Sequence, residues 1–120
     1  MIACLQEEAL CYSSTLYPTL KDEWYPWPNV GSGSDAGIFS PAVVIFKDDL
    51  DHGCVDLPPD ERQVVSVMTV AAPRSPHLVE GKFMPQTLHW MREKIRLVYR
   101  MAAHNGQHYL VLGMLFLNFC

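Results

Sequence analysis

The sequence lacks the signals of a secreted, zinc-binding or membrane-spanning protein. Its four cysteines, Cys4, Cys11, Cys54 and Cys120, include no C-x-x-C pair and follow no zinc spacing. The first residues contain no basic segment followed by a long apolar core, so they do not predict a signal peptide. The apolar run at residues 109–119 is shorter than the ~20 residues that a membrane span needs. We therefore expect an intracellular protein, cytoplasmic or nuclear, with no membrane partner and no metal.

Positive charge is also scarce. With 9 basic and 13 acidic residues, the net charge is −4, whereas proteins that bind nucleic acid directly usually carry a basic excess. We therefore expect no direct nucleic-acid partner. A small anionic ligand is compatible with this charge, because backbone N–H groups and helix N-termini bind phosphate without net positive charge. A hydrophobic content of 49% over 120 residues indicates one globular domain or part of a larger one.

The pattern along the chain predicts the order helix, loop, strand, loop, strand, helix, strand. Residues 3–13 are rich in strong helix formers, and residues 87–104 repeat apolar side chains every three or four positions. Residues 42–47, 63–71 and 108–112 are short apolar runs typical of buried strands. Such strands with a crossover helix predict an α/β fold, a parallel or mixed sheet flanked by helices.

The helix predicted over residues 87–104 has two distinct sides and a clear end at Asn105-Gly106. The apolar stripe consists of Leu88, Met91, Ile95, Val98 and Ala102. Beside it lie three basic side chains, which form either a solvated face or a surface for phosphate groups: Arg92, Arg96 and Arg100.

The most specific motif is Gln6-Glu7-Glu8 at the start of the first helix. Taken alone, these carboxylates have a simple explanation, since negative charge near a helix N-terminus complements the helix dipole. However, the motif is followed by LCYSSTLYPTL at residues 10–20. The combination closely resembles the catalytic helix of microbial-type poly(ADP-ribose) glycohydrolases.

Three later stretches are also similar to that family, residues 38–48, 69–73 and 110–113. The resemblance then covers residues 6–113 of a single domain at 1–120, with an atypical tail at residues 114–120. It implies a partial macrodomain-like fold, a mixed sheet flanked by helices, that binds ADP-ribose at the carboxyl ends of its strands. The implied partner is ADP-ribose, or poly(ADP-ribose) on modified proteins, and the implied chemistry uses no cofactor.

The resemblance also assigns a reaction and its residues. The reaction is hydrolysis of the ribose–ribose glycosidic bond, and Glu8 would be the catalytic carboxylate. Glu7 would hold the ribose hydroxyls, Gln6 would shape the same turn, and Gly113 would begin the phosphate-binding loop. The residue type suits this chemistry, because a carboxylic acid can protonate the leaving oxygen and its carboxylate can then activate water.

The sequence departs from the family at both ligand loops. None of residues 1–5 is glycine, where the family has three glycines before the motif. Gly113 is followed by bulky apolar residues at 114–119 in place of a glycine-rich loop. We therefore expect a domain truncated at both ends, with weak or absent catalysis. The alternatives are a non-catalytic ADP-ribose-binding or protein-interaction module, and a non-functional fragment whose exposed strand edges favour aggregation.

Other chemically suggestive residues have structural explanations. Asp48, Asp49 and Asp51 lack the spacing of a calcium-binding EF-hand and predict a solvated acidic turn. The aromatic side chains of residues 24–27 either stack on adenine or anchor a loop. The five histidines are scattered, which favours solvated or structural roles over metal binding.

Overall fold

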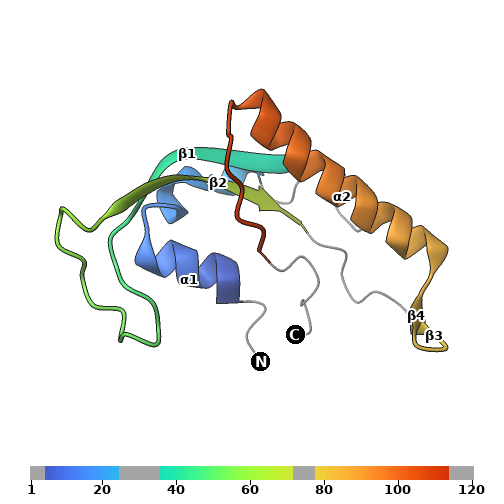
Figure 1. Cartoon of the computed structure of the whole chain (residues 1–120), viewed down its shortest axis with the longest axis horizontal. Coiled ribbons are helices and arrows are strands. Elements are labelled where there is room, and N and C mark those ends of the chain that lie inside the picture. The colour runs from blue at the N-terminus through green and yellow to red at the C-terminus, as the bar shows by residue number, and fades with distance from the viewer. Residues whose placement is uncertain (1–4, 25–35, 72–77, 114–120) are drawn as a thin grey trace.

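The computed structural model describes residues 5–24, 36–71 and 78–113, with the backbone alone at residues 5–7 and 24. Its elements are α1 (Leu5–Ser13), the 3-10 helices η1 (Tyr17–Thr19) and η2 (Asp22–Trp24), β1 (Gly37–Ile45), β2 (Gln63–Val70), β3 (Leu78–Val79), β4 (Lys82–Phe83) and α2 (Pro85–His104). Figure 1 shows β1 and β2 running between the two α-helices. Three stretches lie outside the described residues: the aromatic residues beyond residue 24, the Gly-Ser stretch at 31–34 and the tail at 114–120.

Both predicted helices are confirmed. The end of α2 lies where the sequence predicts, because Asn105 caps the helix and Gly106 adopts a φ of 66° that favours glycine. The N–H of Gly106 donates to the carbonyl of Ala103 at 3.1 Å, and that of Gln107 to the carbonyl of Ala102 at 2.9 Å. These two bonds form a Schellman motif, which satisfies helix carbonyls that would otherwise have no partner.

The buried side of α2 differs in part from the predicted stripe. Met91, Val98 and Ala102 are buried as expected, but Leu88 is exposed. Lys94 is buried instead, with 2% of its surface exposed. A charged side chain is seldom buried so completely, so apolar periodicity alone does not identify this position.

Both strand pairs within the described residues are antiparallel, so the predicted parallel or mixed sheet is wrong for this part of the chain. β1 pairs with β2, from Gly37 opposite Val70 to Ile45 opposite Gln63, and β3 pairs with β4. A parallel pair needs a long crossover, usually helical. Here the chain between β1 and β2 turns back without a helix, so the strands run in opposite directions. The α/β class itself is confirmed.

A β-bulge divides β1. The register with β2 shifts between Ser40 and Val43. Pro41 has no N–H to donate to a ladder, and Ala42 has a φ of 54°, an uncommon conformation for a residue with a Cβ. The bulge therefore accommodates a proline within the strand and re-aims the side chains that follow it.

The third predicted strand, residues 108–112, is wrong in the described structure. These residues are extended but pair with no described strand. Tyr109 and Val111 are 95% and 97% exposed, although their sequence is typical of a buried strand. Apolar composition did not decide the outcome, because a strand also needs a neighbour for its backbone groups.

The hairpin of β3 and β4 falls between the second predicted strand and the second predicted helix. Its turn residues Glu80 and Gly81 both have positive φ, 50° and 74°. Two adjacent positive-φ residues are typical of a type I′ turn, which suits the twist of a two-residue hairpin. The signal in the sequence was Glu-Gly between the pairs Leu78-Val79 and Lys82-Phe83.

The best-packed part of the described chain joins α1 to β1. Leu16 and Val43 are fully buried, and Ser14 and Ser40 are nearly so. The N–H of Thr15 donates to the carbonyl of Val44 at 3.0 Å, and that of Phe46 donates to Ser13 at 3.0 Å. Residues 13–15 thus extend the sheet at the edge of β1. This α1–β1 junction consists of residues 13–19 and 40–46.

Neither helix in the described ranges combines the length and apolarity that crossing a bilayer requires.

Candidate functional site

Helix α1 carries the predicted catalytic motif. Gln6, Glu7 and Glu8 lie in its first turns, and the Glu8 side chain is exposed. The side chains of Gln6 and Glu7 lie outside the described atoms. An exposed carboxylate on a short helix can reach a ligand only if the helix itself is held in place.

Two serines at the end of α1 bond to the backbone of its last turns and of Leu16 beyond it. Ser13 Oγ donates to the carbonyl of Ala9 at 2.7 Å, and Ser14 Oγ donates to the carbonyl of Leu10. Ser14 Oγ also accepts the N–H of Leu16 at 3.2 Å. The bonds of Ser14 satisfy backbone groups that the helix end would leave open. Helix α1 ends at the first of these serines, Ser13.

A buried hydroxyl pair, missed by the sequence analysis, links the junction across the chain. Thr19 Oγ1 lies 2.7 Å from Ser40 Oγ and 2.6 Å from the carbonyl oxygen of Leu16. Ser40 is 1% exposed, so its hydroxyl depends on a protein partner. The pair fixes the 3-10 turn after α1 against β1 at the start of the bulge. No local pattern in the sequence indicates a contact between residues so far apart.

Lys47 attaches the exposed side of α1. Its Nζ lies 5.4 Å from the centre of the Tyr12 ring and 3.2 Å from Asp56 Oδ1. A cation over an aromatic face is attractive, and the ion pair positions the lysine for it. The side chain therefore links α1 to the chain that follows β1.

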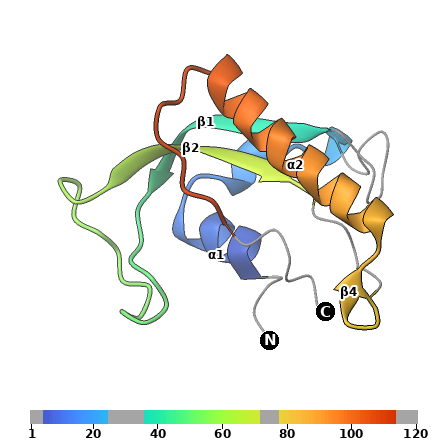
Figure 2. The same cartoon turned by 45° about the vertical axis from the view of Figure 1, so that its right-hand side comes forward.

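Gly113, the fourth predicted site residue, is exposed at the end of the segment that follows α2. In both views this segment, drawn in red, descends from α2 and ends near the N-terminal part of α1 (Figures 1 and 2). Within the described residues, no hydrogen bond joins residues 108–113 to α1. The two predicted parts of the ligand site thus lie on one side of the molecule without a direct polar link.

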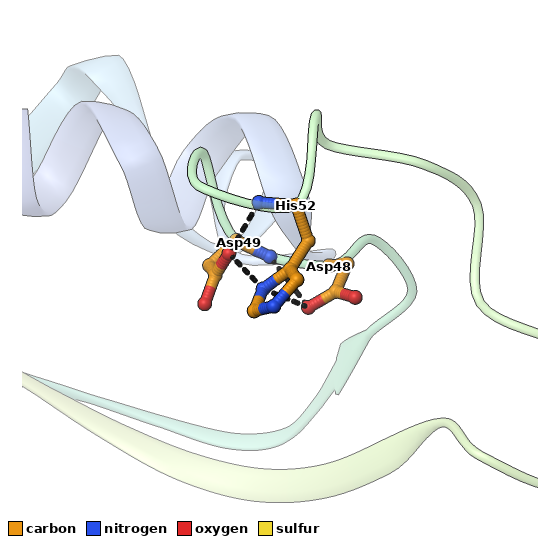
Figure 3. Close-up of side chains that lie close together, drawn as sticks. All are labelled: Asp48, Asp49 and His52. Atoms are coloured by element: carbon orange, nitrogen blue, oxygen red, sulfur yellow. Dashed lines mark hydrogen bonds and ion pairs between the residues drawn. The ribbon is translucent and has the colours of Figure 1, made fainter.

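A second group of chemically active side chains surrounds His52, in the turn after β1 (Figure 3). Asp49 Oδ1 accepts the backbone N–H of His52 at 2.8 Å and lies 2.6 Å from His52 Nδ1. Asp48 Oδ1 lies 3.8 Å from the same nitrogen and accepts the N–H of Asp49 at 2.8 Å. The contact between His52 and these aspartates was not predicted; the Asp-x-x-His spacing was the available signal.

This Asp48–Asp49–His52 cluster shifts its own titration. The hydrogen bond from the His52 backbone lowers the pKa of Asp49 below its ordinary value of 3.8. The hydrogen bond to the Asp49 carboxylate raises the pKa of His52 above 6.5. The side chains of Asp49 and His52 are 61% and 68% exposed, so the resulting attraction is weak.

One ligand atom from each of the three side chains lies within 4.8 Å of the others, a spacing that a cation can bridge. The hydrogen bonds of the turn already account for this arrangement. Asp51, the third predicted acidic residue, is exposed outside the cluster. The predicted solvated acidic turn is therefore confirmed for Asp49 and Asp51.

Comparison with known proteins bears on the segment that contains α1 and β1. Residues 3–48 match the family model for the catalytic domain of microbial-type poly(ADP-ribose) glycohydrolase, PARG. No curated protein and no solved structure matches the chain. The matched residues include Gln6-Glu7-Glu8 and extend through β1 to Asp48. The resemblance to the family, whose enzymes act on poly(ADP-ribose), is thus confirmed for this segment. The similarity of residues 69–73 and 110–113 lies outside the match and stays a prediction.

Proposed function

We propose that this chain is a PARG-like hydrolase that cleaves ribose–ribose bonds of poly(ADP-ribose), with Glu8 as the acid–base residue. The observation that carries the proposal is the family match over residues 3–48, which includes the motif on α1. The exposure of Glu8 supports it, because the carboxylate is accessible to a large polymeric substrate.

The proposed mechanism places both proton transfers on Glu8. Its carboxylic acid protonates the glycosidic oxygen of the departing ribose as the bond breaks and positive charge develops on the other sugar. The carboxylate that remains then removes a proton from the water that attacks this sugar. Each turnover consumes one water molecule and returns Glu8 to its protonated form.

In the proposed binding mode, Glu7 holds ribose hydroxyls and Gln6 shapes the first turn of α1. Gly113 approaches the diphosphate, where the absence of a Cβ leaves room for close contact. The red segment that ends near α1 supports this assignment, since it brings both parts to one side of the molecule (Figure 2). The complete ligand site would have a macrodomain-like arrangement.

The test is release of ADP-ribose from purified poly(ADP-ribose) by the chain and by its Glu8→Gln variant. Loss of general acid–base catalysis predicts a fall in turnover of at least about 100-fold. Glu61→Gln is the matched control, because Glu61 is also exposed but lies in the turn before β2. Equal turnover by the chain and by Glu8→Gln would contradict the assignment of Glu8.

Non-catalytic binding of ADP-ribose is the second candidate. It rests on the same family match, and the bulky residues at 114–119, which stand where the family has a phosphate-binding glycine loop, weigh against turnover. Calorimetric titration with ADP-ribose separates the two. Saturable binding without turnover supports the second candidate, and turnover above that of Glu8→Gln supports the first. A folded chain with neither property would leave the resemblance without a retained function.

A further inference from the structure

Residues 108–112 have the sequence of a strand but no strand partner in the described part of the chain. Tyr109 and Val111, on one side of the extended backbone, are 95% and 97% exposed, and Leu112 is 53% exposed. No backbone hydrogen bond joins these residues to another described residue. The segment carries no Asp, Glu, Lys or Arg, so nothing repels a neighbouring strand.

The same chain has an open sheet edge. Within the described residues β2 pairs with β1 alone, so its alternate N–H and C=O groups point outward. Natural edge strands usually carry charges or proline that prevent further pairing. β2 reads QVVSVMTV and has neither. None of its side chains is fully buried, and Val64 is 68% exposed.

The chain as a whole has a larger accessible surface than a compact monomer of the same mass. The chain exposes 8903 Å². A folded monomer of 13.6 kDa typically exposes about 6,600 Å². The chain as a whole therefore exposes about 2,300 Å² more than a compact monomer of its mass, which is compatible with the roughly 800 Å² that each partner contributes to a standard stable interface.

We propose that two copies of this chain form a closed dimer by strand exchange. Residues 108–112 of each copy add to the outer edge of β2 in the other. A segment of five residues is shorter than the eight-residue β2, so the edge is long enough to receive it. The turn at Gly106 frees the segment from α2 and lets it extend away. Because the exchange is reciprocal between the same two copies, the contact is two-fold symmetric and stops at two chains.

Sedimentation velocity on the full chain, from low to high micromolar concentration, tests the dimer. Val111→Lys and Val64→Lys should each raise the dimer dissociation constant by at least about tenfold, since each change occurs twice in the dimer. Leu50→Lys is the control, because Leu50 is as exposed as Val64 but lies in the turn after β1. A chain that stays monomeric, a dimer unaffected by both lysines, or open-ended assemblies would each overturn the proposal.

Amide hydrogen–deuterium exchange distinguishes strand pairing between two copies from strand pairing within one copy. The amides of residues 108–112 should be protected at high concentration and lose protection on dilution, together with the dimer. Protection that is independent of concentration would mean that the segment pairs with its own chain, and the proposal would fail. Circular dichroism first compares the fold of each variant with that of the parent chain. For Val111→Lys we expect no change of fold, because the Val111 side chain is 97% exposed in the monomer.

Discussion

The α1–β1 junction and residues 107–113 have similarly apolar sequences but very different surroundings. In the junction, Leu16 and Val43 are fully buried and two serines are bonded beside them. In residues 107–113, Tyr109 and Val111 are almost completely exposed. The family match covers the first region and stops well before the second.

The difference shows that backbone partners, as well as apolar side chains, determine which segment packs. Residues 13–15 donate to and accept from the edge of β1, so burial of Leu16 leaves few polar groups without partners. Residues 108–112 pair with no such edge in the described chain. Burying them there would desolvate N–H and C=O groups without replacing their bonds to water, which costs more than the apolar contact returns.

The largest expected difference is in the free energy of unfolding after alanine replaces one leucine in each region. Leu16→Ala should reduce the free energy of unfolding by about 2 to 5 kcal/mol, because it leaves a cavity at a fully buried site. Leu112→Ala removes the same atoms from a side chain that is 53% exposed. It should change the free energy by about 0.5 kcal/mol or less. Urea denaturation at low protein concentration measures both, and similar losses would contradict the comparison.

A double-mutant cycle on Thr19 and Ser40 tests the polar part of the junction. Thr19→Val keeps the side-chain shape but leaves the buried Ser40 hydroxyl without its partner, so we expect a loss of about 1 to 3 kcal/mol. Adding Ser40→Ala removes the orphaned group and should cost less than the sum of the two single changes. Additive losses in urea denaturation would show that the two hydroxyls are not coupled.

The sequence was sufficient for the helices and for the two central strands. Helix formers, apolar spacing and Asn105-Gly106 define α1 and α2 because these signals act within a few residues. β1 and β2 also lie where apolar runs predicted strands. Strand direction was predicted wrongly, since it depends on how the intervening chain returns, which the apolar pattern does not encode.

The candidate site was predictable only where a motif is local. Gln6-Glu7-Glu8 is contiguous and could be found by resemblance. The Thr19–Ser40 contact depends on how η1 sits against β1, so no single stretch of sequence contains it. The burial of Lys94 was missed for the same reason, because it depends on the rotation of α2 against its surroundings.

The smallest expected effect concerns the Asp48–Asp49–His52 cluster, which lies just beyond the junction. His52 should titrate above its ordinary pKa of 6.5, because its ring bonds to the Asp49 carboxylate. Asp49→Asn should return the pKa of His52 towards 6.5, whereas Asp51→Asn, which removes a charge outside the cluster, should leave it raised. NMR titration of the His52 ring protons measures this pKa in the parent chain and in both variants. An unshifted His52, or equal responses to both changes, would show that the contact does not persist in solution.

The signs of the two shifts define where this contact stabilises the fold. The contribution of His52, whose folded pKa is raised, is complete below 6.5 and is lost as pH rises through the folded value. The contribution of Asp49, whose folded pKa is lowered, is complete above 3.8 and is lost as pH falls through the folded value. The pair therefore contributes most between these two pH values. Solvent exposure keeps that contribution small, so Asp49→Asn should alter the His52 titration clearly while changing the free energy of unfolding much less than Leu16→Ala.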